Sequence, residues 1–319
     1  MNFQSFFSRI LIGLGTACLF CAAAAAQTVT VTAPRDMRVA EGNNLYCAGF
    51  VQVAPVDTST KIVGGYNEQE KFLYTQNNEV YVNAGTDKGV HVGDLFSVTR
   101  PRGSVKSHWA HKGDLGFYVE EVGMVEVVKV KPDFSVARVR TSCSDVQLGD
   151  LVTPAKERFS PVYHQRPALD LFADANGKTQ GRLLFAKDDR EVIGREQVVY
   201  IDLGADDDVK AGDYVTVFRP LGSGNLFEND IEYHTDGRNF GYASSDYRGS
   251  KFSNQAARKS GEHAGGKTLT YGDAKKGRPG DLRKVVGEAV ILNVKERTAT
   301  AVITRAAQEI HPGDWVEVQ

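Results

Sequence analysis

The sequence predicts a mainly β protein with two tandem, related domains that each resemble a small β-barrel. Three observations support this prediction. A long segment is repeated along the chain, short runs alternate hydrophobic and polar residues, and no stretch after residue 26 shows the 3.6-residue hydrophobic period of an amphipathic helix. Helices should therefore contribute little to the fold.

Two constant offsets in residue number identify the repeat. Residues 61–101 align with residues 180–220 without a gap, at an offset of 119. Residues 122–152 align with residues 286–316, at an offset of 164. The offsets differ by 45 residues, which indicates an insertion in the second copy.

Each copy of the repeat reads as a series of strands. Phe96 and Val98 alternate with more polar neighbours and correspond to Val215 and Val217 in the second copy. The next block of the first copy has two strand-like runs around a turn at Pro132, and the second copy has the same pattern. We interpret these blocks as β-hairpins.

A Gly-Asp pair follows a short apolar run four times, twice in each copy. The pairs are Gly93-Asp94, Gly149-Asp150, Gly212-Asp213 and Gly313-Asp314. Glycine adopts positive φ without steric cost, and a following aspartate can accept hydrogen bonds from its own local backbone. The pairs therefore predict structural turns that each start a strand, in preference to catalytic carboxylates, and a valine at Gly93 or Gly212 should lower stability.

Residues 1–26 have the pattern of a secretory signal peptide. Arg9 precedes an apolar run, and small residues lead to a predicted cleavage after Ala26. A lipoprotein signal is the weaker alternative, because no aliphatic residue stands three positions before Cys18 or Cys21. We expect export to the periplasm or beyond, with no transmembrane anchor after cleavage.

Export leaves two cysteines, Cys47 and Cys143, in the mature chain. An exported chain with two cysteines most simply forms one disulfide, although two separate buried thiols are an alternative. The formal net charge of −2 gives no field that would favour nucleic acid.

The pattern predicts the following order of segments. A signal peptide (1–26) and an extended arm (27–61) precede the first domain (62–154), a proline-containing linker (155–180) and the second domain (181–319), which contains an insertion at 221–285. The insertion is poor in apolar residues and should be a mobile loop. Its aromatic residues, Tyr242 and Tyr247 among them, suit an adaptable contact surface.

Two patterns resemble functional motifs but lack the context that those motifs need. GEHAGGKT at residues 261–268 satisfies the phosphate-loop expression but lacks the strand and helix that this loop needs. His108 and His111 could ligate zinc but lack a third ligand, and no G-x-S-x-G elbow occurs. We therefore predict no catalytic residue, metal or cofactor, and treat His108 and Trp109 as possible ligand contacts together with the two insertion tyrosines.

The phrases VYVNAGTDKGVHVGDLFSVTRP and VYIDLGADDDVKAGDYVTVFRP resemble the C-terminal β-barrel unit of the flagellar assembly protein T family. They also resemble repeats of bacterial envelope proteins that carry LysM domains. This resemblance implies a periplasmic, non-enzymatic role in envelope assembly, with an envelope protein or peptidoglycan as partner. A peptidoglycan- or glycan-binding module is the first alternative, and an envelope hydrolase is the second.

Overall fold

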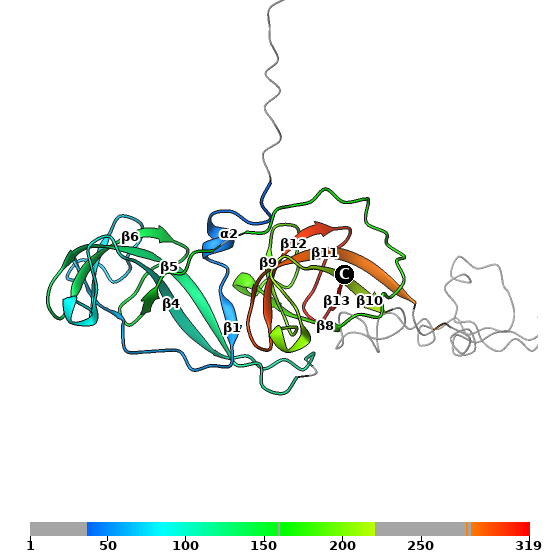
Figure 1. Cartoon of the computed structure of the whole chain (residues 1–319), viewed down its shortest axis with the longest axis horizontal. Coiled ribbons are helices and arrows are strands. Elements are labelled where there is room, and N and C mark those ends of the chain that lie inside the picture. Colours follow the sequence, from blue (N-terminus) through cyan, green and yellow to red (C-terminus); the bar gives the residue numbers. More distant parts are fainter. Residues whose placement is uncertain (1–36, 111, 159, 221–278, 280–281) are drawn as a thin grey trace, which may run out of the picture. The chain divides into compact units, whose positions relative to one another are not determined.

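The computed structural model describes residues 37–110, 112–158, 160–220, 279 and 282–319 (Figure 1). These residues form two antiparallel sheets. Both sheets belong to one compact unit, Arg38–Gln319. Helices are few and short: α2 (Asn43–Tyr46) and the 3-10 turns η2 (Thr86–Lys88), η3 (Lys187–Asp189) and η4 (Ala205–Asp207). The predicted mainly β class is confirmed, and no helix in the described ranges has the length and hydrophobicity to cross a membrane.

The first sheet has seven strands and is open. Its strands are β1 (Phe50–Gln52), β2 (Ile62–Gly65), β3 (Glu79–Val82), β4 (Leu95–Ser104), β5 (Phe117–Val130), β6 (Ser135–Ser142) and β7 (Leu151–Pro154). They run in the order β2-β3-β6-β5-β4-β7, and β1 pairs with β5. The edge strands β2 and β7 are joined by an isolated bridge between Lys61 and Leu151 and by backbone hydrogen bonds of Thr60 and Ile62 to residues 149–152, without forming a paired ladder.

The prediction of a barrel is therefore wrong for the first sheet, for a local reason. The carboxylate of Asp57 accepts hydrogen bonds from the backbone N–H and the hydroxyl of Ser59, at 2.9 and 3.0 Å. This turn ends the contact with β7 at Thr60, whose oxygen accepts from the Val152 N–H, whereas β8 pairs with β13 from Gln180 onward.

The second sheet closes into a barrel of six strands. They are β8 (Gln180–Ala186), β9 (Val198–Ile201), β10 (Tyr214–Pro220), β11 (Arg283–Val294), β12 (Ala299–Ala306) and β13 (Trp315–Val318), in the order β10-β11-β12-β9-β8-β13. β8 is longer than β2, and its residues 180–182 pair with β13. The described part of β11 starts at Arg283, inside the segment predicted as the insertion.

The two sheets repeat the same strand order at the offsets found in the sequence. β3 and β9 differ by 119 in residue number, and β6 and β12, like β7 and β13, differ by 164. The gapless alignment fails at the first strand, because Ile62 pairs with Val82 as Leu183 pairs with Ile201. β2 and β8 thus correspond at an offset of 121, with matching bulges one residue later.

Alternation along the strands produces one hydrophobic core in each sheet. Phe96 and Val98 of β4 are buried in the first core with Tyr74, Val125 and Val139. Val215 and Val217 of β10 occupy the corresponding places in the second core, with Ile193, Ile291 and Ile303. The predicted inward face of the fourth strand is therefore confirmed in both copies.

The segment before the first domain is part of the structure. Cys47 and Cys143 form a disulfide with a Cα–Cα distance of 5.6 Å, as predicted. β1 then pairs with β5, while the hydroxyls of Thr298, just before β12, and Thr300, in β12, donate hydrogen bonds to backbone carbonyls in β1 and next to it. Thr298 Oγ1 lies 2.8 Å from the oxygen of Val51, and Thr300 Oγ1 lies 3.1 Å from that of Gly49. β1 therefore contacts both sheets.

Candidate functional site

The four Gly-Asp pairs share one backbone geometry. The φ angles of Gly93, Gly149, Gly212 and Gly313 are 93°, 89°, 97° and 90°. Each aspartate carboxylate accepts a hydrogen bond from the backbone N–H three residues earlier, namely His91, Gln147, Lys210 and His311, at 2.7 to 2.8 Å. This is the local aspartate turn expected before a strand, and we propose that all four pairs act as turns.

An arginine clamps the second aspartate of each copy. Arg100 donates from Nε and Nη2 to the Asp150 carboxylate at 2.7 and 2.8 Å, and Arg219 does the same to Asp314 at 2.6 and 2.9 Å. Both aspartates are buried. The two arginines are 119 residues apart and the two aspartates are 164 residues apart, which are the two offsets of the repeat. The repeat could therefore have predicted these ion pairs from the sequence.

A substitution at Gly93 tests the turn role. A Cβ on Gly93 would meet no heavy atom within 4 Å, so Gly93→Ala should cost only the left-handed backbone, about 1–2 kcal/mol. Gly113 also has open space around it but no positive φ, so Gly113→Ala is the matched control and should change stability by less than about 0.5 kcal/mol. Urea unfolding measures both variants, and equal stabilities would contradict the turn role.

Two of the predicted ligand contacts, His108 and Trp109, belong to the connection between β4 and β5. The His108 ring is exposed and lies 4.0 Å from the Trp109 ring. The Trp109 indole packs against Gly313, where an added Cβ would approach it to 2.9 Å. We therefore propose a packing role for Trp109; Tyr242, Tyr247 and His111 lie outside the described residues.

Aromatic residues of both sheets pack beside this connection. The Tyr200 hydroxyl donates a hydrogen bond to the Ala48 oxygen at 2.6 Å, and the Tyr200 ring centroid is 4.5 Å from that of Phe185 and 5.2 Å from that of Tyr118. Burial raises the pKa of Tyr200 well above its usual value, with a smaller contribution from Tyr118. Tyr200 is thus a neutral packing group.

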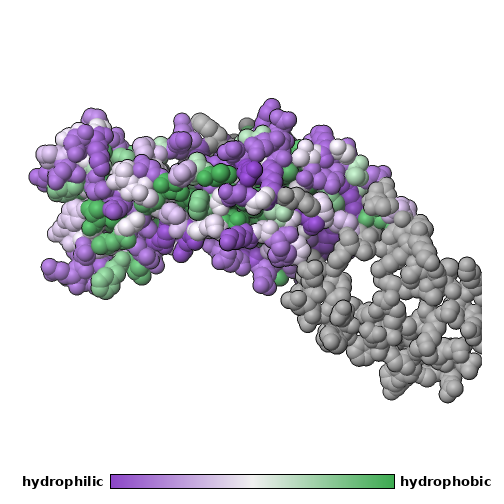
Figure 2. All heavy atoms as spheres, turned by 90° about the horizontal axis from the view of Figure 1, so that it is seen from below, coloured by the Kyte–Doolittle hydropathy of each residue, from purple (hydrophilic) through white to green (hydrophobic). Residues whose placement is uncertain are grey.

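Apolar residues also reach the surface. Figure 2 shows one face on which apolar patches are separated by hydrophilic residues. Phe172 in the linker is 83% exposed, and Phe72 and Tyr66 in the connection between β2 and β3 are 77% and 69% exposed. Exposed apolar side chains that are scattered in this way are ordinary at a protein surface and do not by themselves define a contact surface.

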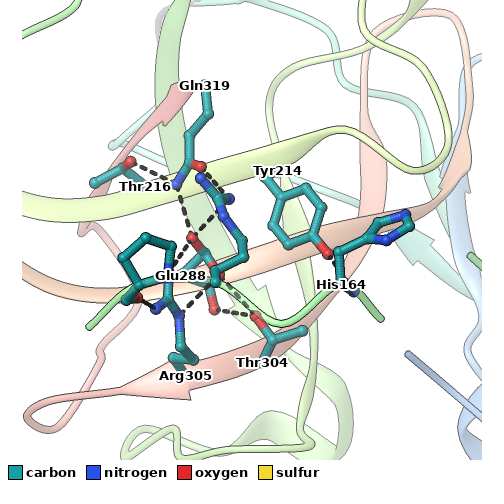
Figure 3. A network of polar contacts seen from close by, with 9 residues as sticks. His164, Tyr214, Thr216, Glu288, Thr304, Arg305 and Gln319 are labelled. Atoms are coloured by element: carbon teal, nitrogen blue, oxygen red, sulfur yellow. Dashed lines mark hydrogen bonds and ion pairs between the residues drawn. The ribbon is translucent and has the colours of Figure 1, made fainter. Parts of the chain in front are cut away.

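The linker is held to the barrel by a polar network around Glu288 of β11 (Figure 3). The Glu288 carboxylate accepts hydrogen bonds from Arg305, Arg166 and Gln319, and its side chain is 1% exposed. Arg166 also lies over the Tyr214 ring, 4.5 Å from the ring centroid. These contacts leave no open carboxylate at Glu288, so the network is a structural anchor.

A cavity of about 570 Å³ lies against the outer face of β4 and β7. Ser97, Thr99 and Thr153 form one wall, and Phe50 of β1 with Lys295 from the turn between β11 and β12 form another. Lys156, Glu157, Arg158 and Asp57 also line it, and Lys295 Nζ lies 4.1 Å from the centroid of the Phe50 ring. Sequence reasoning did not identify this cavity.

Lys295 is half-buried in this cavity. Burial lowers its pKa, and Lys156 and Arg158 lower it further by charge repulsion. Because the unfolded chain then binds more protons than the folded chain, stability should rise with pH between the lowered pKa and 10.5. Lys295→Gln should remove this rise, which a comparison of melting temperatures against pH would show, and identical pH profiles for the two proteins would contradict it.

Within the described ranges, no group of three or more histidine, cysteine, aspartate or glutamate side chains could hold a metal ion. The phosphate-loop expression at residues 261–268 falls outside those ranges.

Comparison with known proteins gives one family match. Residues 77–154 match the family model described as the C-terminal domain of flagellar assembly protein T. The matched segment contains β3 to β7 of the first sheet, and the repeat places its counterpart at residues 196–318 of the second. No curated protein sequence matches the chain.

Proposed function

From the match of residues 77–154 to the C-terminal domain of flagellar assembly protein T, we propose that this chain is a non-catalytic structural protein of the cell envelope that acts in flagellar assembly. That match is the observation that carries the proposal. The match ends at Pro154, the last residue of β7, and its counterpart in the second copy supplies β9 to β13 of the six barrel strands.

The disulfide supports a periplasmic location. Disulfides persist in oxidising compartments such as the bacterial periplasm and are rare in the cytosol. Cys47–Cys143 joins the segment before β1 to the end of β6, so the bond holds together parts that are 96 residues apart in sequence. The predicted signal peptide accounts for the export that this location requires.

The use of charged groups supports a structural role. The carboxylates of Asp150 and Asp314 are each occupied by an arginine and a backbone N–H. The Glu288 carboxylate likewise accepts hydrogen bonds from Arg166 of the linker and from Arg305 of β12. These groups stabilise strand connections and hold the linker, which is what a rigid assembly module needs.

Isolation of flagellar basal bodies tests the proposal. We expect the tagged full chain to purify with basal bodies, and deletion of its gene to abolish or strongly reduce swimming, with recovery when the wild-type gene is restored. Normal swimming in the deletion strain, together with absence of the chain from basal bodies, would contradict the proposal. Retention on purified peptidoglycan in that case would favour the glycan-binding alternative.

A further inference from the structure

The cavity lies on the outer face of β4 and β7. The equivalent face of the barrel, on β10 and β13, is covered by other parts of the chain. Ser97 pairs with Thr153 across β4 and β7, and the corresponding residues Thr216 and Glu317 pair across β10 and β13. The two outer faces are therefore equivalent positions of the repeat, and they can be compared residue by residue.

In the barrel, the linker lies over this face, with Arg166 over the Tyr214 ring and the Ala173 oxygen accepting from Arg283, and residues of β8, β11 and the carboxyl terminus bond its polar groups. Thr216 Oγ1 accepts a hydrogen bond from Gln319 at 2.9 Å, and Glu317 accepts from Arg283 at 2.6 Å and from Gln180 at 2.9 Å. The Asn176 side chain donates to the Val318 oxygen at 2.7 Å. An extended chain segment thus lies along the second copy of the face, and its Asn176 side chain adds a bond to the Val318 oxygen.

In the first sheet, the equivalent residues Ser97 and Thr153 are left open. Among the described residues, their hydroxyls, the hydroxyl of Thr99 and the side-chain amide of Asn293 in β11 make no hydrogen bond, although all four residues line the cavity. Their polar atoms are open to the cavity and not sealed from solvent. These groups therefore offer hydrogen bonds to a molecule that enters the cavity.

The charges around the cavity point to an anion. Lys295 and Lys156 form no ion pair with any described residue, and the Lys295 ammonium lies over the face of Phe50. Arg158 is already paired with Glu121. Of the acids on the wall, Glu121 is engaged by Arg158 and by the N–H of Gly49, Asp57 is engaged by Ser59, and Glu157 is exposed.

We propose that this cavity binds an extended, acidic peptide segment of a partner protein. A carboxylate of the peptide pairs with Lys295 and Lys156, its backbone bonds to the hydroxyls of β4 and β7, and apolar atoms rest on Phe50. A peptide is the fitting occupant because a peptide segment, the linker, covers the equivalent face of the barrel. The cavity volume lies in the range of ordinary ligand sites.

Binding of a defined peptide to the purified full chain tests this site. The probe is a fluorescein-labelled Gly-Ser-Glu-Glu-Ser-Gly peptide, with a Gly-Ser-Gln-Gln-Ser-Gly peptide as its neutral match, measured by fluorescence anisotropy at low ionic strength. We expect the acidic peptide to bind at least about tenfold more tightly than the neutral one. Equal binding of the two peptides, or no binding of either, would overturn the proposal.

Matched variants locate the binding. Lys295→Gln and Lys156→Gln should each weaken acidic-peptide binding, Lys295→Gln by at least about tenfold. Lys210→Gln, at an exposed lysine of the barrel, should leave binding unchanged. Lys156 is exposed, so its variant keeps the test valid if Lys295→Gln disturbs folding, which circular dichroism reports.

Two further outcomes decide against the site. Equal weakening by Lys210→Gln would show a general charge effect. Displacement of the peptide by inorganic phosphate at a comparable concentration would show a site for free anions. These measurements use the purified chain, so their failure leaves the basal-body experiment for the proposed function unaffected.

Discussion

Replacing Arg158 by alanine is expected to lower the free energy of unfolding by about 3–5 kcal/mol, because it leaves the buried carboxylate of Glu121 without its ion-pair partner. The Glu121 side chain is 1% exposed, and both of its oxygens accept hydrogen bonds from Arg158. Without the guanidinium, only the N–H of Gly49, at 3.0 Å, remains as a partner. Chemical denaturation of the purified chain measures the loss.

The neighbouring ion pair supplies the control. Arg102 Nε lies 2.6 Å from the Glu120 carboxylate, but the arginine side chain is 52% exposed. Arg102→Ala should therefore cost no more than about 1 kcal/mol. A similar loss for Arg102→Ala and Arg158→Ala would mean that burial of Glu121 does not set the cost.

Removing the disulfide should have the other large effect. A variant with both Cys47→Ala and Cys143→Ala is expected to lose about 4 kcal/mol, because the reduced chain recovers the entropy of a loop of about one hundred residues. The separation of the two cysteines is 96 residues. Thermal unfolding with and without a reductant measures the effect.

The reductant also supplies the control for this prediction. It should lower the melting temperature of the wild type and leave that of the double variant unchanged. Mass spectrometry of an unreduced digest should find the two cysteine peptides linked. An unchanged melting temperature of the wild type under reduction would show that the bond adds no stability.

Much of the fold could be predicted from the sequence because the repeat carries it. The offsets of 119 and 164 locate the strands, and the inward residues of β4, such as Val98, follow from simple alternation. The closure of the sheets could not be predicted in this way. It depends on a short turn at Asp57 and on a two-residue shift of β2, and neither changes the hydrophobic pattern.

The cavity could not be read from the sequence for a different reason. Its wall combines outward-facing residues from separate elements, such as Ser97, Thr153 and Lys295. Each of these is an ordinary polar residue at the surface of a strand or turn, and only the fold brings them together. The arginine clamps on Asp150 and Asp314 were accessible in principle, since the repeat preserves both partners.

The position of β1 has a consequence for biogenesis. β1 leaves the ribosome early, and β5, its partner in the first sheet, follows it within the same half of the chain. The hydroxyls of Thr298 and Thr300, which complete the other side of β1, are among the last residues to be made. One of the earliest strands of the first half therefore stays incompletely bonded until the carboxyl-terminal half of the chain has been synthesised.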